Sequence, residues 1–171
     1  MYFQKSSSYF LTITYRGAAG GIAGYLSNAT ITNCSSTEDI TRSAPGGGIA
    51  GVVSNCKVSS CYVKSNITSA DGGSACADAG GIIGEAVSSS VDGCRYYGTI
   101  IENSQTITGK RVFGGIIGKA DAASSAGVTT ACGFGGTVNG TTVTETNLST
   151  CAIGSTTGTR GNFYLWNGVL Q

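Results

Sequence analysis

The chain has 171 residues, of which 28 are glycine and only 11% are charged, and its formal net charge is +1. This length predicts a single domain, and the absence of a basic run excludes electrostatic binding of nucleic acid or anionic lipid. No apolar run reaches the ~20 residues of a membrane-spanning helix, so we expect no membrane insertion.

The first 19 residues hold an aromatic stretch, YFLTITYRG, that does not share the pattern of the residues after it. Its β-branched and aromatic residues favour a strand. We therefore expect residues 1–19 to form an N-terminal cap or strand. The stretch is too short and too polar for a signal peptide, so we expect any export signal to lie outside this chain.

A repeat occurs four times over residues 20–152. The copies start at the glycine pairs of Gly20, Gly47, Gly80 and Gly114, which gives periods of 27, 33 and 34 residues. Each copy opens with GGIAG or GGIIG. A cysteine follows, and an aliphatic residue stands six positions after each cysteine, at Ile40, Ile67, Ile100 and Val138. Periods of this length are typical of solenoid coils.

Each copy contains three short β-type segments: the GGIxG stretch, the stretch ending at the cysteine, and the stretch around the later aliphatic residue. We predict an all-β protein, a parallel β-helix (β-solenoid) of four to five coils with three short strands per coil and terminal caps. Stacking at ~4.8 Å would align equivalent side chains in columns. One column would contain Ile22, Ile49, Ile82 and Ile116, and a second the four aliphatic residues after the cysteines.

The last 19 residues, 153–171, contain the stretch NFYLWNG, which again departs from the repeat. An uncovered last coil would expose unpaired backbone and core side chains. We expect this segment to be a C-terminal aromatic cap in which Phe163, Tyr164 and Trp166 cover the final coil.

Four of the seven cysteines, Cys34, Cys61, Cys94 and Cys132, share one repeat position. Neighbouring coils would bring them within disulfide distance, but parallel side chains hinder the ~90° torsion that a disulfide needs. We favour a column of buried, unpaired thiols. The chain has no histidine and no CxxC pair, so we expect no metal site and no cofactor.

Many polysaccharide-cleaving enzymes are β-helices, so a catalytic set of carboxylates is one hypothesis. The acidic residues fall at different offsets in their repeats and would not converge; they are Glu38, Asp39, Glu85, Asp92 and Asp121. Without histidine, a Ser-His-Asp or Cys-His arrangement cannot be built. We therefore expect no catalytic residues.

Two surface features bear on ligand binding: the threonine residues and the aromatic residues. Ice binding needs regular threonine rows, but Thr30 and Thr32 are replaced in later copies by lysine, serine and aspartate. The aromatic residues just after the cysteines could form a glycan-binding strip or could pack under loops; they are Tyr62, Tyr96, Tyr97 and Phe134.

The pattern GGIIGEAVSSSVDGCRYYGTI, Gly80 to Ile100, resembles the GLUG-type repeats of bacterial surface and secreted proteins, which include adhesins and immunoglobulin-A-cleaving peptidases. This resemblance implies a non-enzymatic structural or adhesive repeat domain, extracellular or on the cell surface, with an unknown protein or glycan ligand. The alternatives are a carbohydrate-active or ice-binding β-helix, or a fibre subunit that associates end to end through its terminal strands.

Overall fold

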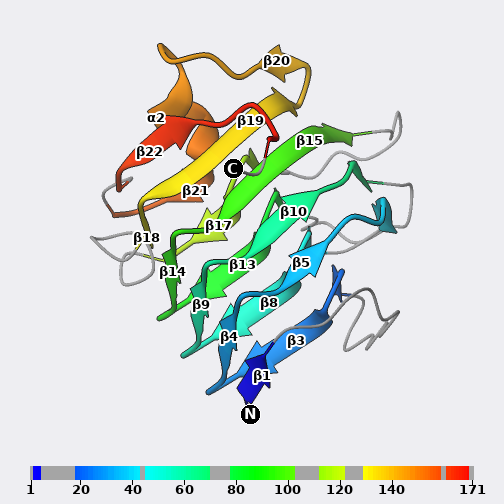
Figure 1. Cartoon of the computed structure of the whole chain (residues 1–171), viewed down its shortest axis with the longest axis vertical. Coiled ribbons are helices and arrows are strands. Elements are labelled where there is room, and N and C mark those ends of the chain that lie inside the picture. The colour runs from blue at the N-terminus through cyan, green and yellow to red at the C-terminus, as the bar shows by residue number, and fades with distance from the viewer. Residues whose placement is uncertain are drawn as a thin grey trace.

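The computed structural model describes residues 2–4, 18–42, 45–69, 78–102, 112–121, 129–158 and 161–169. It is a parallel β-helix, as predicted. The chain winds in coils that stack from β1 at the N-terminal end to β21 and β22 at the other end (Figure 1). Every strand pair recorded among these residues is parallel except β19 with β20.

Four sheets surround the core, and we number them in the order in which a coil enters them. Sheet 1 contains β2 (Ala19–Gly20), β7 (Gly46–Gly47), β12 (Ala79–Gly80) and β16 (Phe113–Gly114). Sheet 2 contains β3 (Ala23–Ser27), β8 (Ala50–Ser54), β13 (Ile83–Val87), β17 (Ile117–Ala120) and β21 (Ile153–Thr156). Sheet 3 contains β1 (Tyr2–Gln4), β4 (Thr30–Thr32), β9 (Lys57–Ser59), β14 (Ser90–Asp92) and β18 (Thr129–Thr130).

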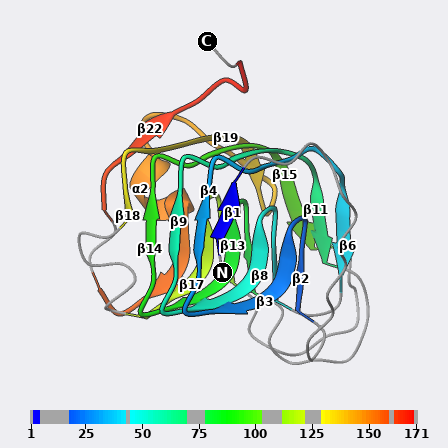
Figure 2. The same ribbon diagram turned by 60° about the horizontal axis from the view of Figure 1, so that its bottom comes forward.

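Sheet 4 is the largest, and its strands follow the cysteines. The first two coils contribute two strands each, β5 (Ser35–Ser36) with β6 (Ile40–Arg42), and β10 (Tyr62–Lys64) with β11 (Ile67–Ser69). Later coils contribute β15 (Arg95–Glu102), β19 (Cys132–Val138) and β22 (Phe163–Leu165), and β20 (Thr141–Thr142) folds back on β19. Figure 2 shows the closed cross-section, with β4, β9 and β14 opposite β6 and β11.

The sequence predicts three strands per coil, but the strands of each coil belong to four sheets. The difference arises at the glycine pair. The sequence predicts a single strand over the GGIxG stretch, whereas the structure has a corner there between two strands. In the third coil β12 ends at Gly80, the chain bends at Gly81 and Ile82, and β13 begins at Ile83. The segment after the cysteine also bends, so it makes two strands in the first two coils.

Each glycine of the GGIxG motif has its own steric reason. A methyl group on Gly80 would overlap the carbonyl oxygen of Ile83, and one on Gly81 would overlap the ring of Tyr96. On Gly84 it would lie 2.5 Å from the backbone nitrogen of Gly46 in the coil before. The motif thus allows one coil to close tightly on itself and on its neighbour.

Two further corners use the left-handed backbone region, which suits Asn and Gly best. One lies just before each cysteine, where Asn33, Ser60, Gly93 and Ala131 have φ of 55, 53, 59 and 49°. The other precedes sheet 3, where Asn28, Asn55 and Ser88 have φ of 52, 51 and 49°. The recurring Asn-Cys and Gly-Cys pairs of the sequence therefore mark a turn.

The predicted aliphatic columns are confirmed. Ile67 pairs in register with Ile40 on one side and Ile100 on the other, and Ile100 pairs with Val138. Ile49, Ile82 and Ile116 are fully buried, and Ile22 packs against them with partial burial. Full burial of each such side chain stabilises the fold by roughly 1.5–3 kcal/mol.

The two terminal segments extend the stack. Of residues 1–19, β1 pairs with β4 in sheet 3, while residues 5–17 lie outside the described part of the chain. Of residues 153–171, β21 and β22 pair with β17 and β19, so they continue sheets 2 and 4 into a fifth coil. Helix α2 (Leu148–Ala152) takes the place of a sheet 1 strand there, because the Cys151 and Ala152 carbonyls accept the Gly115 and Ile116 N–H groups.

The described residues contain no helix that is long and apolar enough to cross a membrane.

Candidate functional site

The four cysteines of the repeat lie in one column at the start of sheet 4. All are buried and unpaired. The thiols of Cys34, Cys61 and Cys94 each donate to the carbonyl oxygen two residues earlier, at 3.5, 3.3 and 3.5 Å. This repeated contact gives the three thiols the same orientation.

Burial within this column favours the protonated form of the Cys34 and Cys94 thiols, whereas the hydrogen bond with Cys94 lowers the pKa of the Cys61 thiol between them. Burial raises the pKa of the Cys34 thiol, and the negative charge that Cys61 could carry raises it further. Hydrogen bonding with the Cys132 and Cys61 thiols, together with burial, raises the pKa of the Cys94 thiol well above its usual value. A protonated, inaccessible thiol is a poor nucleophile and metal ligand, so the column acts in packing.

The aromatic residues after the cysteines do not form one surface strip. Tyr96 and Phe134 are fully buried, which corrects their assignment to a binding surface. They stand two positions after the cysteine and pair in register with each other and with Val63. Because side chains alternate along a strand, this position points inward, whereas the neighbouring positions of Tyr62 and Tyr97 point outward.

Tyr62 and Tyr97 are half-buried because Trp166 packs on both of them. The ring centroids are 5.4 Å apart for Tyr62 and Trp166, and 6.4 Å apart for Tyr97 and Trp166, with edge-to-face geometry in each pair. The Trp166 indole N–H donates to the Val169 carbonyl at 2.9 Å. Trp166 therefore lies against the outer face of sheet 4. The prediction that Trp166 covers the final coil is wrong.

Phe163 and Tyr164 also have roles that differ from each other. Phe163 packs edge-to-face on Phe134 with ring centroids 6.0 Å apart, so it does cover the fourth coil. Tyr164 is 38% exposed, and its hydroxyl accepts the Arg95 Nε–H at 2.9 Å. Arg95 and the C-terminal segment line a pocket on the outer face, with Tyr164, Leu165, Trp166, Asn167 and Val169.

A second pocket lies at the bend in sheet 4, and we call it the Asp39–Tyr97 pocket. It has a volume of ≈ 360 Å³. Its lining comes from four successive coils and consists of Asp39, Lys64, Ser65, Asn66, Tyr97, Gly98, Thr99, Gly136 and Thr137. The sequence indicates Tyr97 as a possible binding residue and Asp39 only as a carboxylate outside any catalytic set. The other lining residues acquire a shared position only when the coils stack.

The polar groups of this pocket are held by a hydrogen-bond chain that crosses three coils. The Asp39 carboxylate accepts the backbone N–H of Asn66 at 2.6 Å and its side-chain N–H at 3.2 Å. The Asn66 side-chain oxygen in turn accepts the Thr99 backbone N–H at 3.1 Å. The carboxylate and the amide are thus fixed in orientation.

Below the pocket, Tyr96 and Ser65 meet. The Tyr96 hydroxyl donates to the Ser65 carbonyl at 3.1 Å, and burial, with a contribution from the negative charge of Asp39, raises the pKa of Tyr96 far above its usual range. The Ser65 side chain is only 6% exposed, and its Oγ has no hydrogen-bond partner among the described residues.

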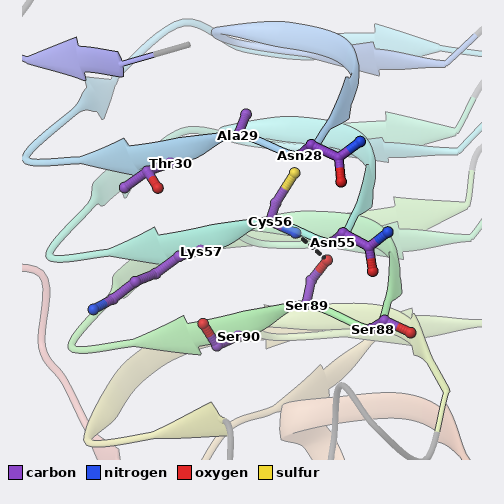
Figure 3. A pocket seen from close by; sticks show the side chains of 9 residues that line it. All are labelled: Asn28, Ala29, Thr30, Asn55, Cys56, Lys57, Ser88, Ser89 and Ser90. Atoms are coloured by element: carbon purple, nitrogen blue, oxygen red, sulfur yellow. Dashed lines mark hydrogen bonds between the residues drawn. The ribbon is translucent and has the colours of Figure 1, made fainter.

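A third pocket lies at the corner before sheet 3 (Figure 3). It is lined by Asn28, Ala29, Thr30, Asn55, Cys56, Lys57, Ser88, Ser89 and Ser90. The Cys56 backbone N–H donates to Ser89 Oγ at 3.0 Å, and that hydroxyl donates to the Val87 carbonyl at 2.8 Å. Lys57 is the one charged side chain in this lining, so the pocket contains no acid–base pair.

The carboxylates considered for catalysis lie apart. Glu85 forms an ion pair with Lys119 at 3.1 Å on the outside of sheet 2. Asp92 is at the end of β14 in sheet 3, and Asp121 accepts the Ser88 N–H at 3.0 Å near the corner that precedes sheet 3. Within the described ranges, no three His, Cys, Asp or Glu residues are grouped so that they could hold a metal ion.

These features define a repeat protein of the β-solenoid class. Residues 15–41 match the family model of the GLUG motif. The match covers the first glycine pair, Cys34 and Ile40, which is one coil, and it is consistent with a GLUG-type repeat. No curated protein and no solved structure matches the chain significantly.

Proposed function

We propose that this chain is a non-enzymatic structural and adhesive repeat domain of an extracellular or cell-surface protein. The observation that carries the proposal is the stack itself, in which each coil pairs in register with the next from β3 to β21. Such a stack is held by backbone hydrogen bonds and core columns over its whole length, which suits a stiff spacer.

The outer surface supports the adhesive part of the proposal. Outward side chains of successive coils stand one above another, as Glu85 and Lys119 do in sheet 2. A stack therefore presents polar and aromatic groups at a fixed spacing, and its unequal loops can vary without disturbing the core.

The test is a binding and activity comparison of the whole chain. Beads coated with it are expected to adhere to immobilised polysaccharides, mucin or extracellular-matrix proteins more than beads coated with albumin do. The soluble protein is expected to release no reducing sugar from the same polysaccharides. Release of sugar would contradict the non-enzymatic part, and adhesion no greater than that of albumin beads would contradict the adhesive part.

End-to-end association is a second candidate, favoured by the first coil. Ile22, Leu26 and Ile40 are only partly buried there, whereas Ile49, Val53 and Ile67 at the same positions of the second coil are fully buried. We propose a second copy of the chain as the occupant. Sedimentation velocity is expected to show concentration-dependent association that Leu26→Glu abolishes, and a monomer at all concentrations would contradict this candidate.

A further inference from the structure

The Asp39–Tyr97 pocket lies where two coils have glycine and a third has serine. Ser65, Gly98 and Gly136 occupy one column at the bend in sheet 4. A methyl group on Gly98 would overlap the Ser65 carbonyl, and Gly136 has φ of +95°, so neither position accepts a side chain. The pocket at this bend has a volume of ≈ 360 Å³, which lies in the ~300–1,000 Å³ range of small-molecule sites.

The walls of this hollow offer hydrogen-bond acceptors and donors in a fixed arrangement. Each Asp39 carboxylate oxygen accepts one hydrogen bond from Asn66 and keeps a lone pair for another donor. The Asn66 amide is held on both sides, by Asp39 and by the Thr99 N–H. A ligand that meets these groups does not have to order them, which favours binding.

One side of the pocket is aromatic. Tyr97 lines it, and its ring is held by the edge of Trp166 and by Gly168, where a methyl group would lie 2.8 Å from Tyr97 Cγ. A fixed ring beside a carboxylate, an amide and threonine hydroxyls offers both an apolar surface and polar groups. A sugar ring has the matching properties, since its C–H face is apolar and its hydroxyls both donate and accept.

We propose that the Asp39–Tyr97 pocket binds one sugar unit of a glycan through two neighbouring hydroxyl groups. The hydroxyls donate to the Asp39 carboxylate and accept from Lys64 and Asn66, while the sugar ring lies against Tyr97. This assignment rests on the proposed adhesive function and names its ligand class.

The experiment measures saccharide binding to the whole chain by saturation-transfer NMR and calorimetry. The probes are the methyl glycosides of glucose, galactose, mannose, fucose and N-acetylglucosamine, followed by an array of immobilised oligosaccharides. The test variants are Asp39→Asn and Lys64→Ala, which leave the core untouched, and Tyr97→Ala. The matched controls are Lys57→Ala and Tyr25→Ala, which remove the same side chains from other outer faces.

We expect at least one probe to bind. Asp39→Asn should weaken it about tenfold or more, because a hydrogen bond to a charged group is lost, and the two controls should bind as the unmodified chain does. Binding of none of the probes, or equal affinity of the Asp39→Asn variant, overturns the inference. Bead adhesion separates the two proposals, because adhesion that persists in the Asp39→Asn variant leaves the adhesive function standing and rejects the pocket.

Discussion

Gly81 faces the ring of Tyr96 across the core, so closely that a methyl group on Gly81 would overlap the tyrosine Cγ. The same relationship recurs between Gly115 and Phe134 in the next coil. Gly81→Ala is expected to lower the free energy of unfolding by about 1–3 kcal/mol, because the enclosed ring and the Gly115 carbonyl of the next coil both have to move. Chemical denaturation followed by circular dichroism measures the change.

A glycine of the same coil provides the control for that substitution. Gly93 has φ of 59°, but Asn33 takes nearly the same conformation at the equivalent corner of the first coil. Gly93→Asn is therefore expected to change stability by less than about 0.5 kcal/mol. If Gly81→Ala and Gly93→Asn lowered the free energy of unfolding equally, the close contacts of Gly81 with Tyr96 and Gly115 would have no special cost.

The thiol column is expected to resist alkylation in the native protein. Cys34, Cys61, Cys94 and Cys132 are buried, whereas Cys151 is half-buried and serves as the internal reference. Peptide mapping after brief maleimide treatment should find Cys151 labelled well before the other four, and all five labelled in denaturant. Disulfide-linked peptides among the four column cysteines would contradict the unpaired column.

Stability should fall in alkaline solution. The pKa of Cys94 is raised by its thiol neighbours and by burial, so the folded chain keeps a proton that the unfolded chain releases above the ordinary value of 9.0. The contribution of protonated Cys94 to the free energy of unfolding is thus fully present below pH 9 and is lost as the pH rises. Burial raises the pKa of Tyr96 in the same way, which adds a loss above pH 10.

Urea midpoints from pH 7 to 11 measure this dependence. Cys94→Ala should flatten the curve just above pH 9, and Tyr96→Phe should flatten it above pH 10. A midpoint in the unmodified chain that is constant up to pH 11 would contradict both assignments.

Trp166 is expected to anchor the C-terminal segment to sheet 4. It is 7% exposed and packs on Tyr62 and Tyr97. Trp166→Ala should release residues 163–169 and increase their cleavage by a protease about tenfold or more, because an edge-to-face pair is worth about 0.5–1.5 kcal/mol and two are lost. Trp166→Phe, which keeps an aromatic ring, is expected to restore most of the protection.

Quenching provides a second measurement on the same residue. Because Trp166 is the single tryptophan of the chain, its fluorescence reports this site alone. Acrylamide should quench it weakly in the native state and strongly in urea. Strong quenching in the native state would mean that the segment does not lie on sheet 4.

Several elements followed from the sequence because they depend on the repeat period. Aligning the copies placed Ile40, Ile67, Ile100 and Val138 in one column, and the register of sheet 4 confirms it. The prediction of one aromatic surface strip is wrong because Tyr96 and Tyr97 are adjacent in the sequence, and strand alternation places adjacent residues on opposite faces. The glycine pair was assigned to a strand because its backbone bend depends on contacts with the neighbouring coil.

The sequence by itself determined the coil, its period and its core columns, because each coil contacts mainly its neighbours and equivalent positions recur at a fixed offset. Only the tertiary structure decided the outer face of sheet 4. The pocket there combines Asp39, Asn66 and Tyr97 from three coils, and Trp166, from the far end of the chain, packs on the Tyr97 ring. The repeat period does not predict that these residues come together, since their positions depend on the bend at Gly98 and on how the last segment packs.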